Sequence, residues 1–311
     1  MPQEVPRLPQ SLGCTLSMNP IDPSEGTTAK RYFGFFLSLG IASALAMPPL
    51  VALGISFRSD YYSHIPLIPL LSAYLLYQRR NTLFDGSEHE PRWGFPVAAA
   101  GFLLYSVGIW GPRLDRHDAS SLMVFSSLLF LFGSFVFLYG TGAFRRAAFP
   151  LFFLLFMVPV PSVLMDKIIY FLQAGSAEVT DMIFKATGIA YLREGFVFYL
   201  PGFSIEIAKE CSGIRSSLAL LITVVLAGHI LLQRFWQKAI LAVSVLPIVL
   251  VKNGIRISVL TFLGMYYDQG IFESSLHRSG GIFFYVLALS LTGIILWVLK
   301  RSNADAGSGR L

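Results

Sequence analysis

Apolar residues in this chain fall into long blocks, which short polar and basic segments separate. A bilayer-spanning helix needs about 17 to 25 mostly apolar residues, and most of these blocks supply them. The pattern predicts an all-α integral membrane protein with about eight transmembrane helices. Their expected bounds are Tyr32–Ile55, Ile65–Tyr77, Trp93–Trp110, Ser121–Tyr139, Ala147–Leu164, Ser216–Leu232, Lys238–Tyr267 and Ile282–Leu299.

Two segments ahead of the sixth span have other patterns. Asp166–Lys185 is too polar to cross a membrane, but it carries an apolar face, as amphipathic helices in the membrane interface do. The stretch after Gly195 alternates aromatic and branched residues about Pro201–Gly202, which predicts a short β-hairpin. The chain then passes through Cys211 into the sixth span.

The block Lys238–Tyr267 decides the topology. As one helix it is about 45 Å long, and a kink at Pro247 and a projecting end absorb its excess over a core of about 30 Å. Two spans in its place are each too short. With one helix, all the basic clusters lie on one side, which predicts cytoplasmic termini. These clusters are Lys30–Arg31, Arg79–Arg80, Arg145–Arg146, Arg234 with Lys238, and Lys300–Arg301.

Composition agrees with this organisation. Of the 311 residues, 54% are hydrophobic and only 14% are charged, which excludes an ordinary soluble domain. The net charge of +6 is accounted for by the basic loops, without nucleic acid. We expect a disordered cytoplasmic tail at 1–31, a membrane domain at 32–299 and a short cytoplasmic tail at 300–311.

The chain contains two cysteines, too few for a disulfide framework or a cysteine-based metal site. No His, Asp and Glu pattern has metal-ligand spacing, and no glycine-rich phosphate loop follows a strand. We therefore expect no metal and no cofactor. Cys14 lies in the N-terminal tail as a bystander.

Cys211 is placed for nucleophilic chemistry. It stands at the mouth of the sixth span, where the helix dipole favours a thiolate, and Arg215 is expected one turn further on the same face. The alternative is a small packing residue, the usual role of a lone cysteine beside a membrane helix.

The expected topology brings Arg256 and His277 to the outer surface with Cys211. Arg256 lies about 27 Å along the seventh span from Lys238, and His277 precedes the eighth. In the alternative interpretation, Arg256 is a structural arginine that pairs with Asp166 or Glu210. His277 is then an ordinary loop histidine without a catalytic role. Lys252, one turn before Arg256, is expected to face a polar cavity.

A cysteine, a histidine and an arginine at one membrane face suit acyl transfer. Thiolate attack gives a thioester, the histidine protonates the leaving amine, and the arginine stabilises the oxyanion. Further residues are candidates for tuning the thiol, orienting substrate or lining the same cavity, although ordinary interfacial charge explains the charged ones equally well. These are Glu210, Arg215, Asn253 and His64.

Several motifs give the chain a resemblance to the exosortases, relatives of the archaeosortases. They are Glu-Cys-Ser-Gly-Ile-Arg-Ser at Glu210–Ser216, Asn-Gly-Ile-Arg at Asn253–Arg256, His277 before the last span, Tyr-Ser-His at Tyr62–His64, and Phe-Met-Val-Pro-Val-Pro at Phe156–Pro161. The resemblance implies a cysteine transpeptidase or protease of the bacterial inner membrane with its active site facing outward. By carry-over Cys211 is the nucleophile, with Arg256 and His277 completing the triad.

The resemblance also implies the substrates. These are exported proteins with a C-terminal sorting signal, which consists of a Pro-Glu-Pro-type (PEP-CTERM) motif, a transmembrane helix and a basic tail. Water, a lipid amine and a glycan-linked amine are all chemically able to resolve the thioester, so membrane lipids are potential partners.

Two other functions fit the same residues. A transporter or lipid-handling protein would bind an anionic substrate at Lys252 and Arg256, and Cys211 would be dispensable. A non-catalytic assembly subunit for exported polymers would need none of these side chains individually.

Overall fold

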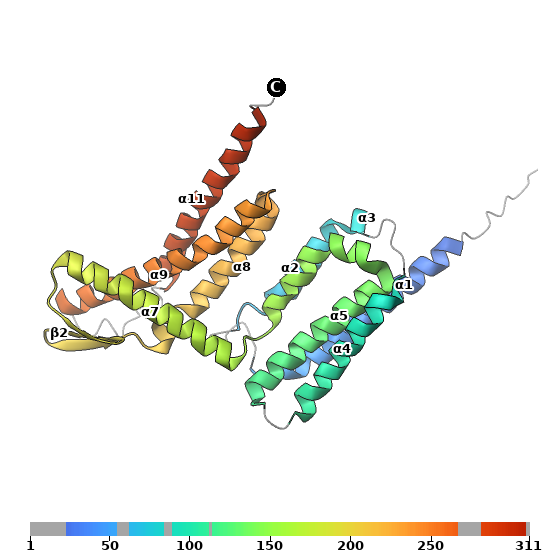
Figure 1. Ribbon diagram of the computed structural model, residues 1–311, viewed down its shortest axis with the longest axis horizontal. Coiled ribbons are helices and arrows are strands. Elements are labelled where there is room, and N and C mark those ends of the chain that lie inside the picture. The colour runs from blue at the N-terminus through green and yellow to red at the C-terminus, as the bar shows by residue number, and fades with distance from the viewer. Residues whose placement is uncertain (1–22, 55–61, 84–88, 112–113, 267–280, 309–311) are drawn as a thin grey trace, which may run out of the picture.

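The computed structural model describes residues 23–54, 62–83, 89–111, 114–266 and 281–308. These residues form helices and one small sheet (Figure 1). The helices are α1 (Pro23–Ala52), α2 (Leu67–Gln78), α3 (Arg80–Leu83), α4 (Pro91–Trp110), α5 (Arg116–Arg146), α6 (Ala148–Phe153), the 3₁₀ helix η1 (Leu154–Met157), α7 (Ser162–Thr187), the 3₁₀ helix η2 (Lys209–Ser212), α8 (Ile214–Leu231), α9 (Phe235–Tyr266) and α11 (Gly281–Ser308).

The all-α membrane class is confirmed. Among the described residues, six helices are long and apolar enough to cross a membrane, or seven if one bent pair counts as a span. The six are Phe33–Ala52, Pro91–Trp110, Arg116–Arg146, Ile214–Leu231, Phe235–Tyr266 and Ile282–Ser302. The number eight stays a prediction, because α2 has only 12 residues and the fifth apolar block is broken.

The break in the fifth block follows from its prolines. α6 and η1 end at Met157, and α7 begins at Ser162 with its axis turned by 87°. Pro159 and Pro161 lack amide donors and disfavour helical conformation in the residues before them. Asp166–Lys185, expected as one or two interfacial helices, is part of the single 26-residue helix α7.

The prediction of one long helix at Lys238–Tyr267 is confirmed, since α9 has 32 residues with Pro247 inside it. At about 1.5 Å per residue it is about 48 Å long, longer than the hydrocarbon core. At both chain ends the helices extend past the expected spans. α1 begins at Pro23, ahead of Tyr32, and α11 continues to Ser308, beyond Leu299.

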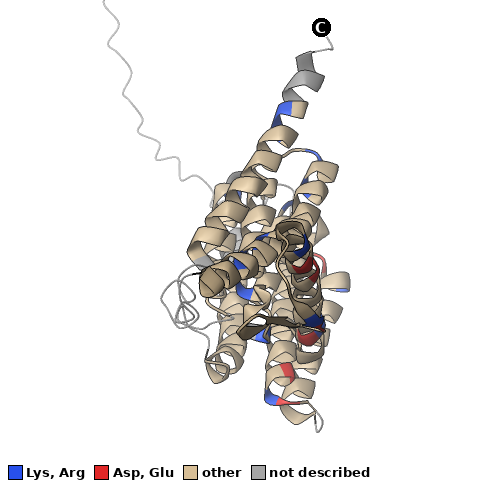
Figure 2. Ribbon diagram, turned by 90° about the vertical axis from the view of Figure 1, so that its left-hand side faces the viewer, with Lys and Arg blue, Asp and Glu red and all other residues tan. Residues whose placement is uncertain are grey.

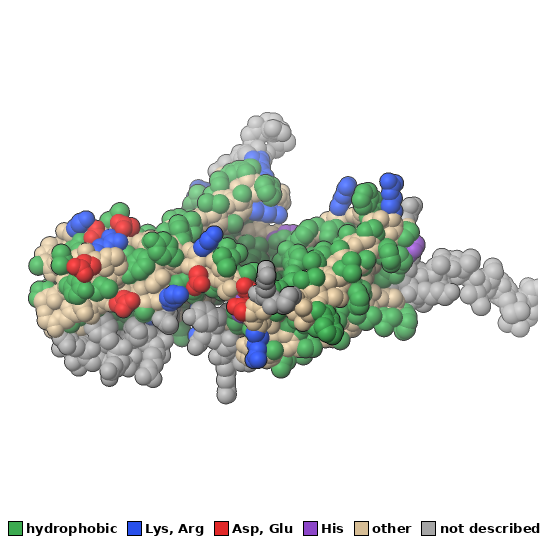
Figure 3. Space-filling model, turned by 60° about the horizontal axis from the view of Figure 1, so that its bottom comes forward, with side chains coloured by type: hydrophobic (Ala, Val, Ile, Leu, Met, Phe, Trp, Pro, Cys, Tyr) green, Lys and Arg blue, Asp and Glu red, His purple; other side chains and the backbone are tan. Residues whose placement is uncertain are grey.

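The helices form two packed groups (Figure 1). In the first, α5 packs against α1 and α4, and Gly94 lets α4 approach so closely that an added Cβ would lie 2.3 Å from Phe137 N. In the second, α9 packs against α7, α8 and α11, and α7 crosses α9 where Gly175 and Gly254 remove side-chain bulk. Large hydrophobic side chains cover much of the outer surface (Figure 3), as a lipid environment requires.

The predicted hairpin is two strands of a three-stranded antiparallel sheet of order β1–β2–β3. The strands are β1 (Leu192–Glu194), β2 (Val197–Leu200) and β3 (Phe203–Glu206). Gly195 and Gly202 sit in the two turns with positive φ, at 60° and 94°. β1 was not predicted, because three residues are too few for a visible alternation.

Side chains from α7 hold the sheet in place. Phe198 of β2 is fully buried against Phe184 of α7. Tyr191 donates a hydrogen bond to Asp181 Oδ1 at 2.6 Å. Burial raises the pKa of Tyr191 to about 12, and the bond to Asp181 acts in the same direction, so the phenol remains a donor at neutral pH.

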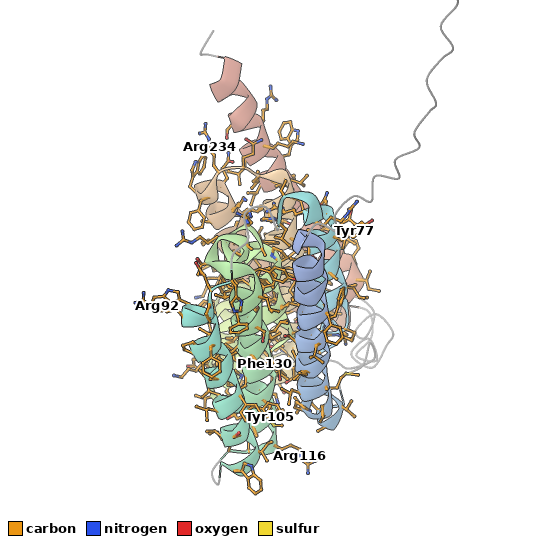
Figure 4. All side chains as sticks on the ribbon, turned by 90° about the vertical axis from the view of Figure 1, so that its right-hand side faces the viewer. Tyr77, Arg92, Tyr105, Arg116, Phe130 and Arg234 are labelled. Atoms are coloured by element: carbon orange, nitrogen blue, oxygen red, sulfur yellow. The ribbon has the colours of Figure 1, made fainter. Side chains whose placement is uncertain are left out.

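Contacts join the helix ends that carry basic clusters: Arg146 Nε donates to Leu83 O at 3.1 Å, and Gln237 Nε2 donates to Leu299 O at 2.9 Å. Lys and Arg also occur elsewhere along the molecule (Figure 2). One end of the molecule carries these joined helix ends. Arg234 and Tyr77 lie at that end, whereas Arg116 and Tyr105 lie at the opposite end (Figure 4). Arg79 contacts His229 Nε2 at 3.2 Å, which joins the end of α2 to the end of α8. This arrangement is what the positive-inside argument needs, while the side on which this end lies stays a prediction.

Candidate active site

Cys211 lies in a turn between the sheet and α8. It belongs to the 3₁₀ helix η2, and its amide donates to Ala208 O at 2.9 Å. Gly213 then reverses the backbone with φ of +76°, and α8 begins at Ile214. Cys211 and Arg215 therefore flank a break, so the expectation that they share one face of one helix is wrong.

Glycine is needed at 213 for two reasons. Its left-handed conformation is strained for any residue with a Cβ. In addition, an added Cβ would lie 3.1 Å from Asn253 Oδ1 and 3.5 Å from Lys252 Nζ. The carbonyl of Gly213 accepts from Ser216 Oγ at 3.0 Å and from Ser217 Oγ at 2.7 Å. These contacts fix the entry of the chain into α8.

Asn253 ties this turn to two long helices. Its side chain is fully buried on α9, and Nδ2 donates to Cys211 O and to Ser176 Oγ of α7, each at 2.9 Å. Its Oδ1 has no hydrogen-bond partner among the described residues and faces Gly213. Asn253 thus holds the main chain of the cysteine in a fixed position relative to α7 and α9.

Lys252, the residue before Asn253 on α9, also contacts this part of the chain, through Ser216 in the first turn of α8. It is only 3% exposed, and Nζ donates to Ser216 Oγ at 2.6 Å. Sequence reasoning expected a polar cavity here and missed Ser176 and Ser216 as partners. The available signals were the small-residue run Ala174–Ala177, which allows close helix contact, and the position of Ser216 in the first turn of α8.

Arg256 is half-buried on α9, one turn beyond Asn253. Because Asn253 contacts the main chain of Cys211, the structure brings the helix that carries Arg256 to the cysteine. His277 lies outside the described residues. α11 begins at Gly281 and packs against α8 through Tyr285 Oη and Thr223 Oγ1, which are 3.3 Å apart.

The structure describes the surroundings of two further candidates, His64 and Arg215. His64 hydrogen-bonds to the main chain of Phe156, in the neighbourhood of α2 and η1. Burial lowers the pKa of His64, and the bond to Phe156 opposes that shift. Arg215 is exposed on the first turn of α8, and the side chain of Glu210 lies outside the described part.

In the described part of the chain, no group of three or more His, Cys, Asp or Glu is arranged so that it could hold a metal ion. The described polar groups that contact the turn of Cys211 include the Asn253 amide and the Lys252 ammonium, which hold the backbone and place positive charge near it.

Fold and site together define a multi-spanning membrane protein that presents a fixed cysteine at the junction of a small sheet and a helix. A family model described as transmembrane exosortase matches residues 56–294. The chain belongs to this family. Searches of the curated proteins and of the solved structures found no match.

Proposed function

We propose that the chain is an exosortase-type cysteine transpeptidase or protease that cleaves the C-terminal sorting signal of exported proteins. The family is in general one of membrane cysteine transpeptidases, and it implies processing of exported proteins with sorting signals. The observation that carries the proposal is the bond from Asn253 Nδ2 to Cys211 O, which links the cysteine to the helix of Arg256.

In the proposed reaction, the Cys211 thiolate attacks the carbonyl carbon of the scissile peptide bond. Arg256 stabilises the oxyanion, and His277 gives a proton to the leaving amine as the C–N bond breaks. The resulting thioester is attacked by water or by an amine, whose proton passes to His277, and the thiolate is released. The substrate's own transmembrane helix sets the depth of its scissile bond.

The turn around Cys211 supports this chemistry in two ways. Asn253 and Gly213 fix the backbone, so the thiol needs no reorganisation before attack. The ammonium of Lys252 lies beneath the turn in a poorly hydrated environment and favours negative charge there. We place this site at the outer face of a bacterial inner membrane.

The transporter hypothesis has less support. It needs Lys252 and Arg256, with Asn253 between them, to meet an anionic substrate within the membrane. Instead, Lys252 Nζ is bonded to Ser216, and Asn253 Nδ2 is bonded to Ser176 and Cys211.

The test uses an exported reporter protein that ends in a Pro-Glu-Pro motif, a transmembrane helix and a basic tail. Cleavage is followed in cells by the mass of the reporter, with Cys211→Ala, Arg256→Ala and His277→Ala compared with Cys14→Ala as the control cysteine variant. We expect Cys211→Ala to abolish cleavage, the Arg256 and His277 variants to reduce it at least about 100-fold, and Cys14→Ala to behave as wild type. Wild-type cleavage by Cys211→Ala would contradict the proposal.

A further inference from the structure

A groove opens beside the turn that carries Cys211. It has a volume of about 750 Å³ and lies between the start of α7, the sheet and η2. Asp166, Lys167, Tyr170, Gln173, Phe196, Glu206, Ala208 and Lys209 line it. Its size falls within the range of about 300 to 1,000 Å³ that is usual for ligand sites.

The groove lies next to the turn that carries Cys211, because Ala208 and Lys209 in its lining precede the cysteine by three and two positions. Ala208, one of its lining residues, accepts the amide hydrogen bond of Cys211 at 2.9 Å. Gln173 of α7 donates to Ile207 O at 2.7 Å and so fixes the chain that forms the wall of the groove. The end of the groove at Ala208 and Lys209 is therefore the end nearest in the chain to the nucleophile proposed above.

Glu206, in the lining of the groove, belongs to β3, the outer strand of the described sheet. β2 and β3 are joined by a two-residue turn, so Leu200 and Phe203 form the closing hydrogen-bonded pair. Such pairs alternate along antiparallel strands, so Ser204 and Glu206 direct their main-chain groups away from β2. Glu206 O accepts from Ala208 N at 3.0 Å. The Ser204 N–H and C=O and the Glu206 N–H have no main-chain partner among the described residues.

The charges of the groove suit a polar peptide better than an apolar one. Asp166 and Glu206 face Lys167 and Lys209, so the lining is mixed in sign. The one ion pair among them, Lys209 with Asp166 at 3.3 Å, has both side chains 66% exposed. Exposed pairs contribute little, so an entering ligand displaces this one at small cost.

Exposed hydrophobic residues accompany the groove on α7, as expected for a protein surface at the level of the membrane interface. Val163, Leu164 and Phe171 on the same part of α7 are exposed hydrophobic residues. Acidic and basic side chains are interspersed with hydrophobic ones on this face (Figure 3). A protein anchored by its own transmembrane helix presents the segment next to that helix at this level.

We propose that this groove binds the extended segment of the exported protein that precedes the scissile bond, by adding it as a strand to the outer edge of β3. Main-chain hydrogen bonds to Ser204 and Glu206 fix the register of the segment against β3. The carbonyl carbon of the scissile bond is thereby directed to Cys211. The inference rests on the function proposed above, because it requires Cys211 to be the nucleophile.

The test uses the full chain in membranes and two alkylating reagents. An acetylated tetra-alanyl chloromethyl ketone alkylates Cys211 after binding as a peptide, whereas iodoacetamide alkylates it without a peptide chain. Ser204→Pro removes the outward amide and Ser204→Ala is its matched control, since proline is tolerated at a strand edge. We expect Ser204→Pro, and N-methylation of the peptide reagent, each to slow the peptide reagent about fivefold while the iodoacetamide rate stays unchanged.

If the peptide reagent alkylates Cys211 at the same rate in wild type and in Ser204→Pro, the groove assignment is wrong. The proposed function is unaffected by that result. Competition by vesicles of a zwitterionic phospholipid, with no effect of N-methylation, would assign the groove to a lipid headgroup and also overturn it. Inertness of Cys211 toward both reagents at every pH would instead overturn the proposed function, and the groove assignment with it.

Discussion

The second helix group buries amide and ammonium side chains, whereas the described residues of α1, α4 and α5 in the first group include no buried side chain of either kind. In α5 of the first group, Ser126 and Ser127 are fully buried and bond back to carbonyls of their own helix, at 2.6 and 2.8 Å. In the second group, Asn253, Lys252 and Gln173 are also buried, and each donates a hydrogen bond to a segment outside its own helix. Hydroxyl groups form bonds of both kinds in both groups: Tyr105 Oη of α4 donates to Leu45 O of α1 at 3.0 Å, and Thr180 Oγ1 of α7 donates to Ser176 O of its own helix at 2.8 Å.

From this difference we infer that the first group is a structural scaffold and that the second group contains the active site. A serine that donates to a carbonyl of its own helix satisfies its hydrogen-bonding group without a partner on another helix. Contacts between such helices then depend on apolar and small residues. A buried lysine or asparagine between elements is costly to desolvate and holds those elements in one arrangement. The second group accepts that cost at the turn of Cys211, which is where we place the chemistry.

The largest expected effects come from two glycines, one in each group. Gly94→Ala places a Cβ 2.3 Å from the backbone of Phe137, so α4 and α5 must separate. We expect it to lower the free energy of unfolding by about 3 kcal/mol, measured in mixed detergent micelles. The rate of Cys211 alkylation by iodoacetamide should not change, because the site lies in the other group.

Gly213→Ala should change the reactivity of Cys211 more than it changes the stability of the protein. The positive φ costs about 1 to 2 kcal/mol, less than in Gly94→Ala, but the Cβ pushes on Asn253 Oδ1 and moves the turn of Cys211. We expect the alkylation rate of Cys211 to change severalfold. Gly293→Ala, with nothing within 4 Å of its Cβ, is the control and should be neutral or slightly stabilising. An unchanged alkylation rate in Gly213→Ala would show that the turn does not set the reactivity of the thiol.

A smaller effect is expected at Lys252, where stability and reactivity should move in opposite directions. Lys252→Met removes a buried ammonium, while Ser216 Oγ keeps its bond to Gly213 O. The protein should become about 1 kcal/mol more stable. Without the positive charge, the midpoint of a pH profile of Cys211 alkylation should rise, and Lys252→Arg should restore part of the shift. A profile unchanged in Lys252→Met would assign the lysine to packing alone.

The sequence was sufficient for features that depend on local composition and length. The long helix α9 was predictable because its length and the distribution of basic clusters allow one topology. The motif at Glu210–Ser216 pointed to the family that the comparison identified. The fifth block was misjudged because Pro159 and Pro161 were expected near the end of a span, whereas they turn the chain by 87°.

The site was less predictable because it depends on register between distant segments. The bond from Lys252 to Ser216 joins residues 36 positions apart, and that from Asn253 to Ser176 joins residues 77 apart. Helical periodicity places each residue on a face, but it does not say which residue of another helix lies opposite. The glycine at 213 was a readable signal that Cys211 precedes the helix rather than beginning it.

The smallest effect is expected at His64, which lies outside the second group's site. Burial lowers the pKa of His64 below its usual value of 6.5, so the unfolded chain binds a proton at a higher pH than the folded protein does. Stability is therefore fully present above pH 6.5 and is lost as the pH falls from 6.5 toward the lowered pKa. His64→Gln should flatten the stability–pH curve in that window, while the pH profile of Cys211 alkylation should match wild type. If instead the cysteine profile shifts in His64→Gln, His64 belongs to the active site and the separation of the two groups does not hold.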